Sequence, residues 1–207
     1  MPPVQVETSR IRPFPTPQAF QTWLSTHHAS APELWLRIYK KDSGVQTITY
    51  AEALDIALCY GWIDGIRKSY DATSFLQRFT PRRPKSVWSQ VNRDHIARLI
   101  KEKRMTPHGL KQVEAAKQDG RWDAAYAPIR AATPGSLPKD LRAAIKANAK
   151  AERSFKTLTK MNIFALAYRT NAMRTPAGRE RKIAALVAML ARGETITPQA
   201  KPAAKKK

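Results

Sequence analysis

The stretch that decides the fold class is residues 62–80, WIDGIRKSYDATSFLQRFT. Its second half, 74–80, places Phe75 and Phe79 on one side of an alternating pattern, and a period of two is typical of a β-strand. Asp71 and Ala72 separate this segment from 62–70 and have the character of a turn. The stretch therefore predicts a β-hairpin.

A third strand is predicted upstream of the hairpin, over residues 34–39. Leu34, Leu36 and Ile38 alternate there with Trp35, Arg37 and Tyr39. Strand patterns are confined to the first half of the chain, and none follows Pro84.

Helix starts are marked by Thr-Pro pairs at 16–17, 106–107 and 175–176. Threonine caps a helix N-terminus, and proline is favoured at the first helical position because its missing N–H has no partner there. Thr49 and Glu52 form a capping-box pattern. Further helices are predicted to begin at Asn92, after Pro138 and at Thr159.

These patterns predict an α+β fold: a small N-terminal unit with a short antiparallel sheet and helices, then a mainly helical unit. We expect the α+β unit over 10–104 and the helical unit over 105–195. Residues 196–207 are rich in lysine, alanine and proline and are predicted to be a disordered basic tail.

The chain is strongly basic, with a net charge of +21, and the charge is uneven. Residues 1–70 hold seven basic and six acidic side chains, whereas 121–200 hold fifteen and five. Such a surface attracts an anionic ligand, an acidic protein or nucleic acid, although a solvated basic face that keeps the protein soluble remains an equal alternative.

Cys59 is the single cysteine, so an intrachain disulfide is excluded. It lies in an apolar run and is expected to be a small core residue. The N-terminal residues 1–17 lack the apolar stretch of a signal peptide, and the longest apolar run, 183–191, is too short to span a bilayer. We expect a cytoplasmic protein without a transmembrane segment.

One constellation between Gly61 and Ser89 is a candidate binding site. It combines two tryptophans, an acid and six basic side chains: Trp62, Asp64, Arg67, Lys68, Arg78, Arg82, Arg83, Lys85 and Trp88. Arginine beside aromatic rings suits the capture of phosphate or carboxylate and the stacking of bases. In the competing interpretation the tryptophans are core residues, Asp64 pairs with an arginine and the other charges are solvated.

Recognisable catalytic patterns are missing from the sequence. The four histidines and Cys59 have no metal-ligand spacing, and neither a glycine-rich phosphate loop nor a Gly-x-Ser-x-Gly elbow occurs. The sequence predicts no metal and no cofactor, and it favours a protein that is not an enzyme. An enzyme with Asp64 as acid or base stays open, because catalytic groups need not be adjacent in sequence.

Several of these segments resemble the YdeI/OmpD-associated family of bacterial proteins. The resemblance is carried by WLRIYKK (35–41), TYAEAL (49–54), GWIDG (61–65) and QRFTPRR (77–83), and by the helix over 181–193. Trp88-Ser89, Met105-Thr106-Pro107 and Gly120-Arg121-Trp122 continue it, so that it covers most of residues 14–195.

The resemblance implies a role in bacteriocin protection or antimicrobial-peptide resistance, and it supplies no catalytic residues. A basic protein repels cationic peptides, so we expect protection to be indirect, by a module that binds an anion or a partner. The alternative is a nucleic-acid-binding protein that uses the basic constellation and the lysine tail without sequence preference. The sequence does not specify an oligomeric state.

Overall fold

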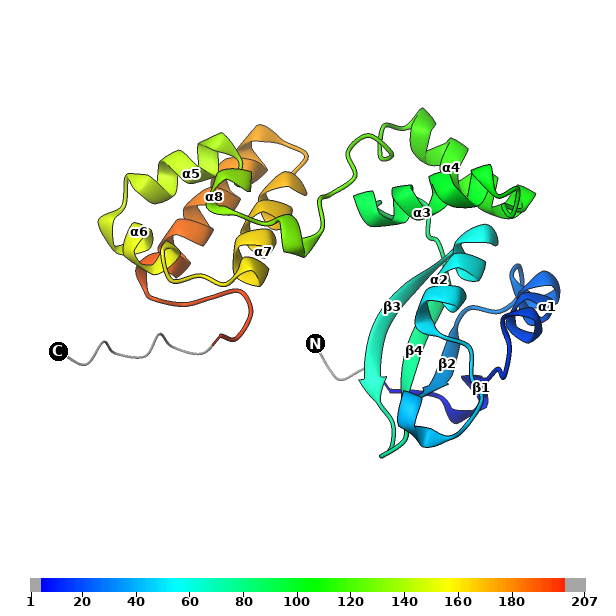
Figure 1. The fold of residues 1–207 in the computed structure, drawn as a ribbon. Coiled ribbons are helices and arrows are strands. Elements are labelled where there is room, and N and C mark those ends of the chain that lie inside the picture. Colours follow the sequence, from blue (N-terminus) through cyan, green and yellow to red (C-terminus); the bar gives the residue numbers. More distant parts are fainter. Residues whose placement is uncertain (1–4, 200–207) are drawn as a thin grey trace. The chain divides into compact units, whose positions relative to one another are not determined.

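A computed structural model describes residues 5–199, which form two compact units divided between Ala125 and Tyr126 (Figure 1). The first unit holds the sheet and four helices, and the second is helical. The α+β class is therefore confirmed. The predicted boundary was placed after residue 104, and the helix that follows it packs in the first unit. Residues 200–207 of the predicted tail lie outside the described residues.

The sheet of the first unit has four strands in the order β1-β2-β4-β3. The predicted hairpin is β3 (Trp62–Ser69) and β4 (Ser74–Pro81), and β4 also pairs antiparallel with β2 (Leu34–Tyr39). A short strand that the sequence did not predict, β1 (Ile11–Pro13), adds to β2 in parallel. The pairing of β3 with β4 shifts between Asp64 and Arg67, where a bulge interrupts the ladder.

The helices of this unit are α1 (Pro17–His27), α2 (Tyr50–Cys59), α3 (Gln90–Lys101) and α4 (Pro107–Gln118), with short 3-10 turns at Thr8–Arg10 and Lys41–Ser43. Thr16, Thr49 and Thr106 cap them as predicted. The prediction of Asn92 as a cap is wrong. Ser89 caps α3, because its extended backbone lets its Oγ accept the amide of Asn92 at 3.1 Å.

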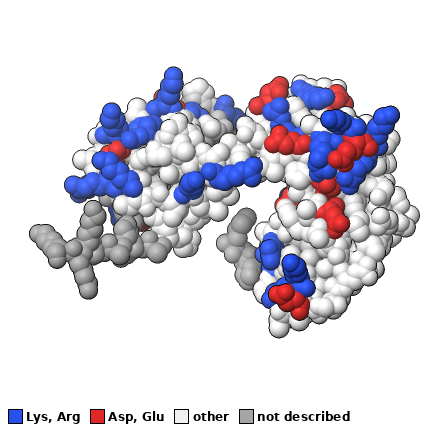
Figure 2. All heavy atoms as spheres, viewed as in Figure 1, with Lys and Arg blue, Asp and Glu red and all other residues white. Residues whose placement is uncertain are grey.

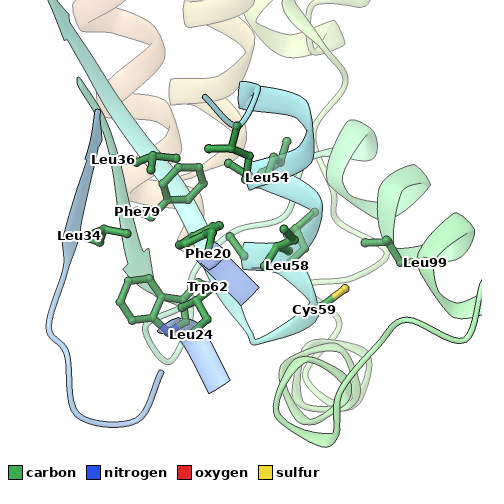
Figure 3. Packing of buried hydrophobic residues seen from close by; sticks show 14 of the residues in the cluster. Phe20, Leu24, Leu34, Leu36, Leu54, Leu58, Cys59, Trp62, Phe79 and Leu99 are labelled. Atoms are coloured by element: carbon green, nitrogen blue, oxygen red, sulfur yellow. The ribbon is translucent and has the colours of Figure 1, made fainter. Parts of the chain in front are cut away.

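One face of the sheet is covered by α1 and α2, and the core lies between these layers. Figure 3 shows Leu54 and Leu58 of α2 facing the strand residues Leu36 and Phe79. Phe20 of α1 packs on Phe79 with ring centroids 5.9 Å apart. Each such buried side chain contributes about 2 kcal/mol to folding, so this interface is a main source of the unit's stability.

Helix α4 approaches the end of α2 so closely that only glycine fits at the contact. A Cβ on Gly109 would overlap the carbonyl oxygen of Cys59 and lie 2.7 Å from Cε of Met105. The hydroxyl of Thr106 donates to the same carbonyl at 2.6 Å. The first turn of α4 is thus fixed on the last turn of α2.

The second unit contains α5 (Lys139–Lys146), α6 (Ala149–Phe155), α7 (Lys160–Asn171) and α8 (Pro176–Ala191), with 3-10 turns at Ile129–Ala131 and Pro134–Ser136. Its own core includes Leu141, Ile145, Leu166 and Leu190. Helix α6 was not predicted. Residues 196–199, expected to belong to the tail, are held by Asn162, whose Oδ1 accepts the amide of Thr197 at 2.9 Å.

We predict that Gly109→Ala destabilises the protein by about 2 to 3 kcal/mol, because the new methyl group has to displace the backbone of α2 or α4. Urea unfolding followed by circular dichroism measures this loss. Gly65→Ala is the matched control, since its Cβ would meet atoms no closer than 3.6 Å. Equal unfolding midpoints for the two variants would contradict the close approach.

Candidate functional site

The predicted binding residues lie in three different surroundings: the core, the sheet and the connection from β4 to α3. Trp62 belongs to the core. It is 1% exposed, its Nε1 donates to the carbonyl of His28 at 3.0 Å, and its ring meets Trp23 edge-on. Trp62 therefore stabilises the fold and presents no face to a ligand.

Asp64 accepts a hydrogen bond from the hydroxyl of Tyr50 at 2.8 Å. Burial of the phenol, together with the charge of Asp64, raises the pKa of Tyr50 well above its ordinary value. The phenol is therefore a permanent donor at neutral pH. This pairing, rather than the arginine considered from the sequence, fixes the carboxylate.

Three cations of the set lie over aromatic rings of the sheet. The guanidinium of Arg67 is 3.7 Å from the ring centre of Phe75. Lys68 and Arg78 lie 5.8 and 6.0 Å from the ring of Trp35. Each contact is of the cation–π type, worth about 0.5–1 kcal/mol at an exposed position.

Arg78 is also neutralised within the sheet. Its Nε donates to Oε2 of Glu33 at 2.7 Å. Burial opposes ionisation of Glu33, but the hydrogen bonds from Arg78 and others outweigh it, so the pKa of Glu33 is lowered. The charge of Arg78 is therefore largely neutralised by Glu33.

The connection from β4 to α3 brings together the remaining four residues. Arg82 is 6% exposed and stacks on Trp88 at 3.5 Å, while its Nη1 donates to the carbonyl of Val87 at 3.3 Å. Arg83 and Lys85 are exposed on a turn with Pro84 between them. Arg82 and Trp88 thus hold the connection, and Arg83 and Lys85 face solvent.

Sequence reasoning missed the partners that complete this arginine–tryptophan group. Trp122 meets Trp88 edge-on at 5.0 Å, and Arg93 donates to the carbonyl of Trp122 at 2.9 Å. Arg121 donates to the carbonyl of Ser86 at 2.8 Å. The segment GRW (120–122) has the same combination of arginine and tryptophan as the predicted site, and this was the signal available in the sequence. The group ties the segment before α3 to the segment after α4.

An ionic cluster between α2 and α3 was also missed. Asp55 accepts bonds of 2.6 Å from Nη2 of Arg98 at both carboxylate oxygens, and Nδ1 of His95 lies 2.8 Å from Oδ1. Burial disfavours the charge of Asp55, but the bonds from Arg98 and His95 outweigh burial and lower its pKa. The cluster is a structural anchor and a fixed source of charge.

No group of three or more His, Cys, Asp or Glu that could hold a metal ion occurs within residues 5–199. The same residues include no helix that is both long and apolar enough to cross a bilayer.

The helical unit has the largest surplus of positive charge. Residues 126–199 hold fourteen basic and four acidic side chains. Three of these acids already bind arginines: Glu152 at 2.6 Å from Arg142, Glu194 at 2.8 Å from Arg192, and Asp140 at 2.5 Å from Arg179. Figure 2 shows many blue and few red side chains on this unit. The surface charge of this unit is therefore mainly positive.

Part of this surplus lies on α5 and α6 and on Lys156, the residue that follows α6. Lys146, Lys150 and Lys156 are all exposed, and the charges of Lys156 and Lys146 help to lower the pKa of Glu152 after the larger effect of its hydrogen bond to Arg142. We name these three lysines the α5–α6 basic patch.

An aromatic strip lies on α7 of the same unit. Phe164 and Tyr168 are one turn apart with ring centroids at 5.7 Å, and Tyr126 meets Tyr168 edge-on at 5.3 Å. Met161 on the preceding turn is 43% exposed and Tyr168 is 37% exposed. Tyrosine, phenylalanine and methionine on a surface are typical of protein interfaces.

Two family models match the chain, one in each unit. Residues 12–112 match a model described as a domain of unknown function (DUF8412). Residues 135–193 match the model described as Bacteriocin-protection, YdeI or OmpD-Associated. No curated protein and no solved structure matches the chain.

The family resemblance is thus confirmed for residues 135–193 of the helical unit, which match the bacteriocin-protection model. The segments at 35–41, 49–54, 61–65 and 77–83, on which most of the resemblance was based, lie in the range of the other model. The residues of the predicted site therefore lie outside the matched bacteriocin-protection domain.

We predict that Asp55→Asn lowers the free energy of unfolding at pH 7 by about 2 to 3 kcal/mol, because Arg98 loses its buried anion. A lowered pKa means that this contribution is present above about pH 4 and is lost as pH falls through the folded-state pKa. Urea unfolding between pH 7 and pH 2 measures it.

The difference between wild type and Asp55→Asn should shrink below about pH 4. The control is Asp42→Asn, which removes an exposed carboxylate and should leave stability within about 0.5 kcal/mol. A difference that stays constant down to pH 2 would show that folding does not lower the pKa of Asp55.

Proposed function

We propose that this chain is a non-enzymatic binding protein in bacteriocin protection, and that its helical unit holds an acidic protein partner. The observation that carries the proposal is the charge of that unit. Residues 135–193, which match the bacteriocin-protection family, hold thirteen basic and three acidic side chains. Complementary potentials accelerate association and select partners.

The pairing of the acids supports an outward-directed role for the cations. Asp140, Glu152 and Glu194 are bound to arginines within the unit, so Glu152, which also interacts with Lys146 and Lys156, neutralises the α5–α6 basic patch only in part. A surface of this kind is disfavoured by self-repulsion in the isolated protein. Binding of an anionic partner relieves that repulsion.

The aromatic strip favours a protein over nucleic acid as the partner. Met161 and Tyr168 expose apolar area on the unit that also carries the basic patch. Desolvation of such side chains supplies binding energy to a protein interface, whereas sequence-independent nucleic-acid binding depends mainly on phosphate contacts. The first unit also has exposed cations from the predicted site, namely Arg67, Arg83 and Lys85. They would give this unit contacts of its own with an anion.

The sign of the charge supports indirect protection. A basic surface repels cationic antimicrobial peptides, so sequestration of the peptide is disfavoured. We place the protein's action in the cytoplasm, on a partner whose acidity complements the helical unit.

We predict that fluorescently labelled polyglutamate binds the full chain and that its affinity falls steeply between about 50 and 200 mM NaCl. The variant with Lys146, Lys150 and Lys156 replaced by glutamine should bind about tenfold or more weakly at the lower salt, because three exposed charges are lost. Fluorescence anisotropy measures both effects.

The matched control replaces three exposed lysines of the first unit, Lys41, Lys101 and Lys111, by glutamine. It changes the net charge equally and should bind nearly as the wild type does. Equal losses in the two variants would indicate attraction by net charge alone. Tighter binding of a mixed-sequence 30-base-pair DNA duplex than of polyglutamate would favour the nucleic-acid alternative.

A bacteriocin-sensitive strain that produces the wild-type chain should survive higher bacteriocin concentrations than one that produces the α5–α6 triple variant. Survival curves at equal protein level measure this difference. Identical survival curves would show that the α5–α6 basic patch has no part in protection, even if it binds polyglutamate.

A further inference from the structure

Helix α3 ends in a left-handed turn that is built on lysine. The amide of Lys103 donates to the carbonyl of Ile100 and that of Arg104 to the carbonyl of Leu99, both at 3.0 Å. Lys103 has a φ of 56°. This closure normally has glycine at the left-handed position, because a side chain is strained there. A lysine there is an outlier that calls for an explanation.

The end of α8 shows the ordinary solution in the same chain. The amide of Gly193 donates to Leu190 and that of Glu194 to Met189, so the bonding pattern is the same. Gly193 has a φ of 74°. Backbone geometry alone therefore does not require lysine at residue 103.

The lysine turn borders a cavity of about 270 Å³. The cavity is lined by Gln21 of α1, by Ile56, Cys59 and Tyr60 at the end of α2, and by Lys103 and Arg104. Figure 3 shows Cys59 on the side of α2 that faces Leu99 of α3. The walls thus come from helices that the core and the Gly109 contact hold in place.

The charged side chains that line the cavity are Lys103 and Arg104, while the carboxylates of Asp55 and Glu102 lie outside the lining but close enough to act on Cys59. Arg104 is partly engaged, with its Nη1 2.9 Å from Glu102 and 3.7 Å from Asp55. Within residues 5–199, no carboxylate forms an ion pair with Lys103. Its ammonium group is therefore available to an anion from solution.

Two of the side chains that line the cavity, Ile56 and Cys59, are apolar. Ile56 and Cys59 are 4% and 5% exposed, and burial raises the pKa of the Cys59 thiol to about 11. The thiol is neutral at physiological pH, so it neither repels an anion nor acts as a nucleophile. It serves as a small apolar part of the cavity wall.

We propose that this cavity binds a small organic oxyanion, whose charged end contacts Lys103 and Arg104 and whose apolar body lies against Ile56 and Cys59. A water molecule occupies about 30 Å³ in the liquid, so the volume suits a ligand of roughly ten non-hydrogen atoms. The cavity lies in the first unit and is independent of the acidic-partner surface of the helical unit.

The test titrates the ¹⁵N-labelled full chain with benzoate, benzamide and inorganic phosphate, and follows the amide resonances by NMR. Benzoate should shift the signals of residues 99–104 and Cys59. Benzamide has the same shape without the charge, and phosphate has charge without the apolar body, so each should bind more weakly.

Lys103→Gly is the informative variant, because glycine accepts the left-handed backbone and the protein should stay folded. It should bind benzoate about tenfold more weakly, while its urea midpoint should rise. Lys101→Gln is the control: it removes an exposed lysine two residues earlier, outside the cavity lining, and should bind benzoate as the wild type does.

Unchanged benzoate affinity in Lys103→Gly would overturn the proposal, even if the variant is more stable, because the lysine would then have no part in binding. Equal shifts by benzamide and benzoate, or no binding of benzoate to the wild type, would overturn it as well.

Discussion

The first unit depends on the contact between Gly109 and the carbonyl of Cys59. This contact sets the distance between α4 and α2, and the left-handed turn that ends α3 leads directly into α4. The position of that turn therefore follows from a steric constraint that is not adjustable, since only glycine fits against the carbonyl. The hydrogen bond from Thr106 to the same carbonyl adds direction to the contact. A cavity bordered by a rigid turn can hold a charge at a fixed place without ordering a loop on binding.

The sequence predicted those elements whose signals are local. Thr49 and Glu52 form their capping box within one helical turn, and the alternation in 74–80 indicates a strand from the local pattern alone. β1 was missed because three residues carry no periodicity, and its pairing with β2 depends on contacts distant in sequence. The cap of α3 was misplaced because Ser89 and Asn92 are both good capping residues. Only the extended backbone at Ser89 decides between them.

The candidate site shows even more strongly that local sequence patterns do not report contacts between distant residues. Composition identified arginine and tryptophan as partners, and Arg82 does stack on Trp88. Composition could not show that this pair is buried, or that Trp62 belongs to the core. A buried cation–π pair and an exposed one have the same sequence pattern, but only the exposed pair can meet a ligand. Trp122 completes the group from the segment that follows α4. Trp88 precedes α3, and no sequence rule links two residues so far apart in the chain.

Two lysines in left-handed backbone suggest that charge was retained against a stability cost. Lys85 has a φ of 70° and Lys103 a φ of 56°, while glycine serves at the comparable positions 44, 61, 120 and 193. A non-glycine residue in this region costs about 1 kcal/mol or more. Lys85 follows Pro84 in a turn closed by a bond from the amide of Ser86 to the carbonyl of Arg83, a position where glycine is again usual. Both lysines are exposed in the first unit, where the charge is otherwise more balanced than in the helical unit. If net charge alone were needed, lysine on any exposed helical position would supply it without strain. At a left-handed position the backbone instead sets the direction of the Cα–Cβ bond of lysine, which favours anion contacts at a defined place over general attraction.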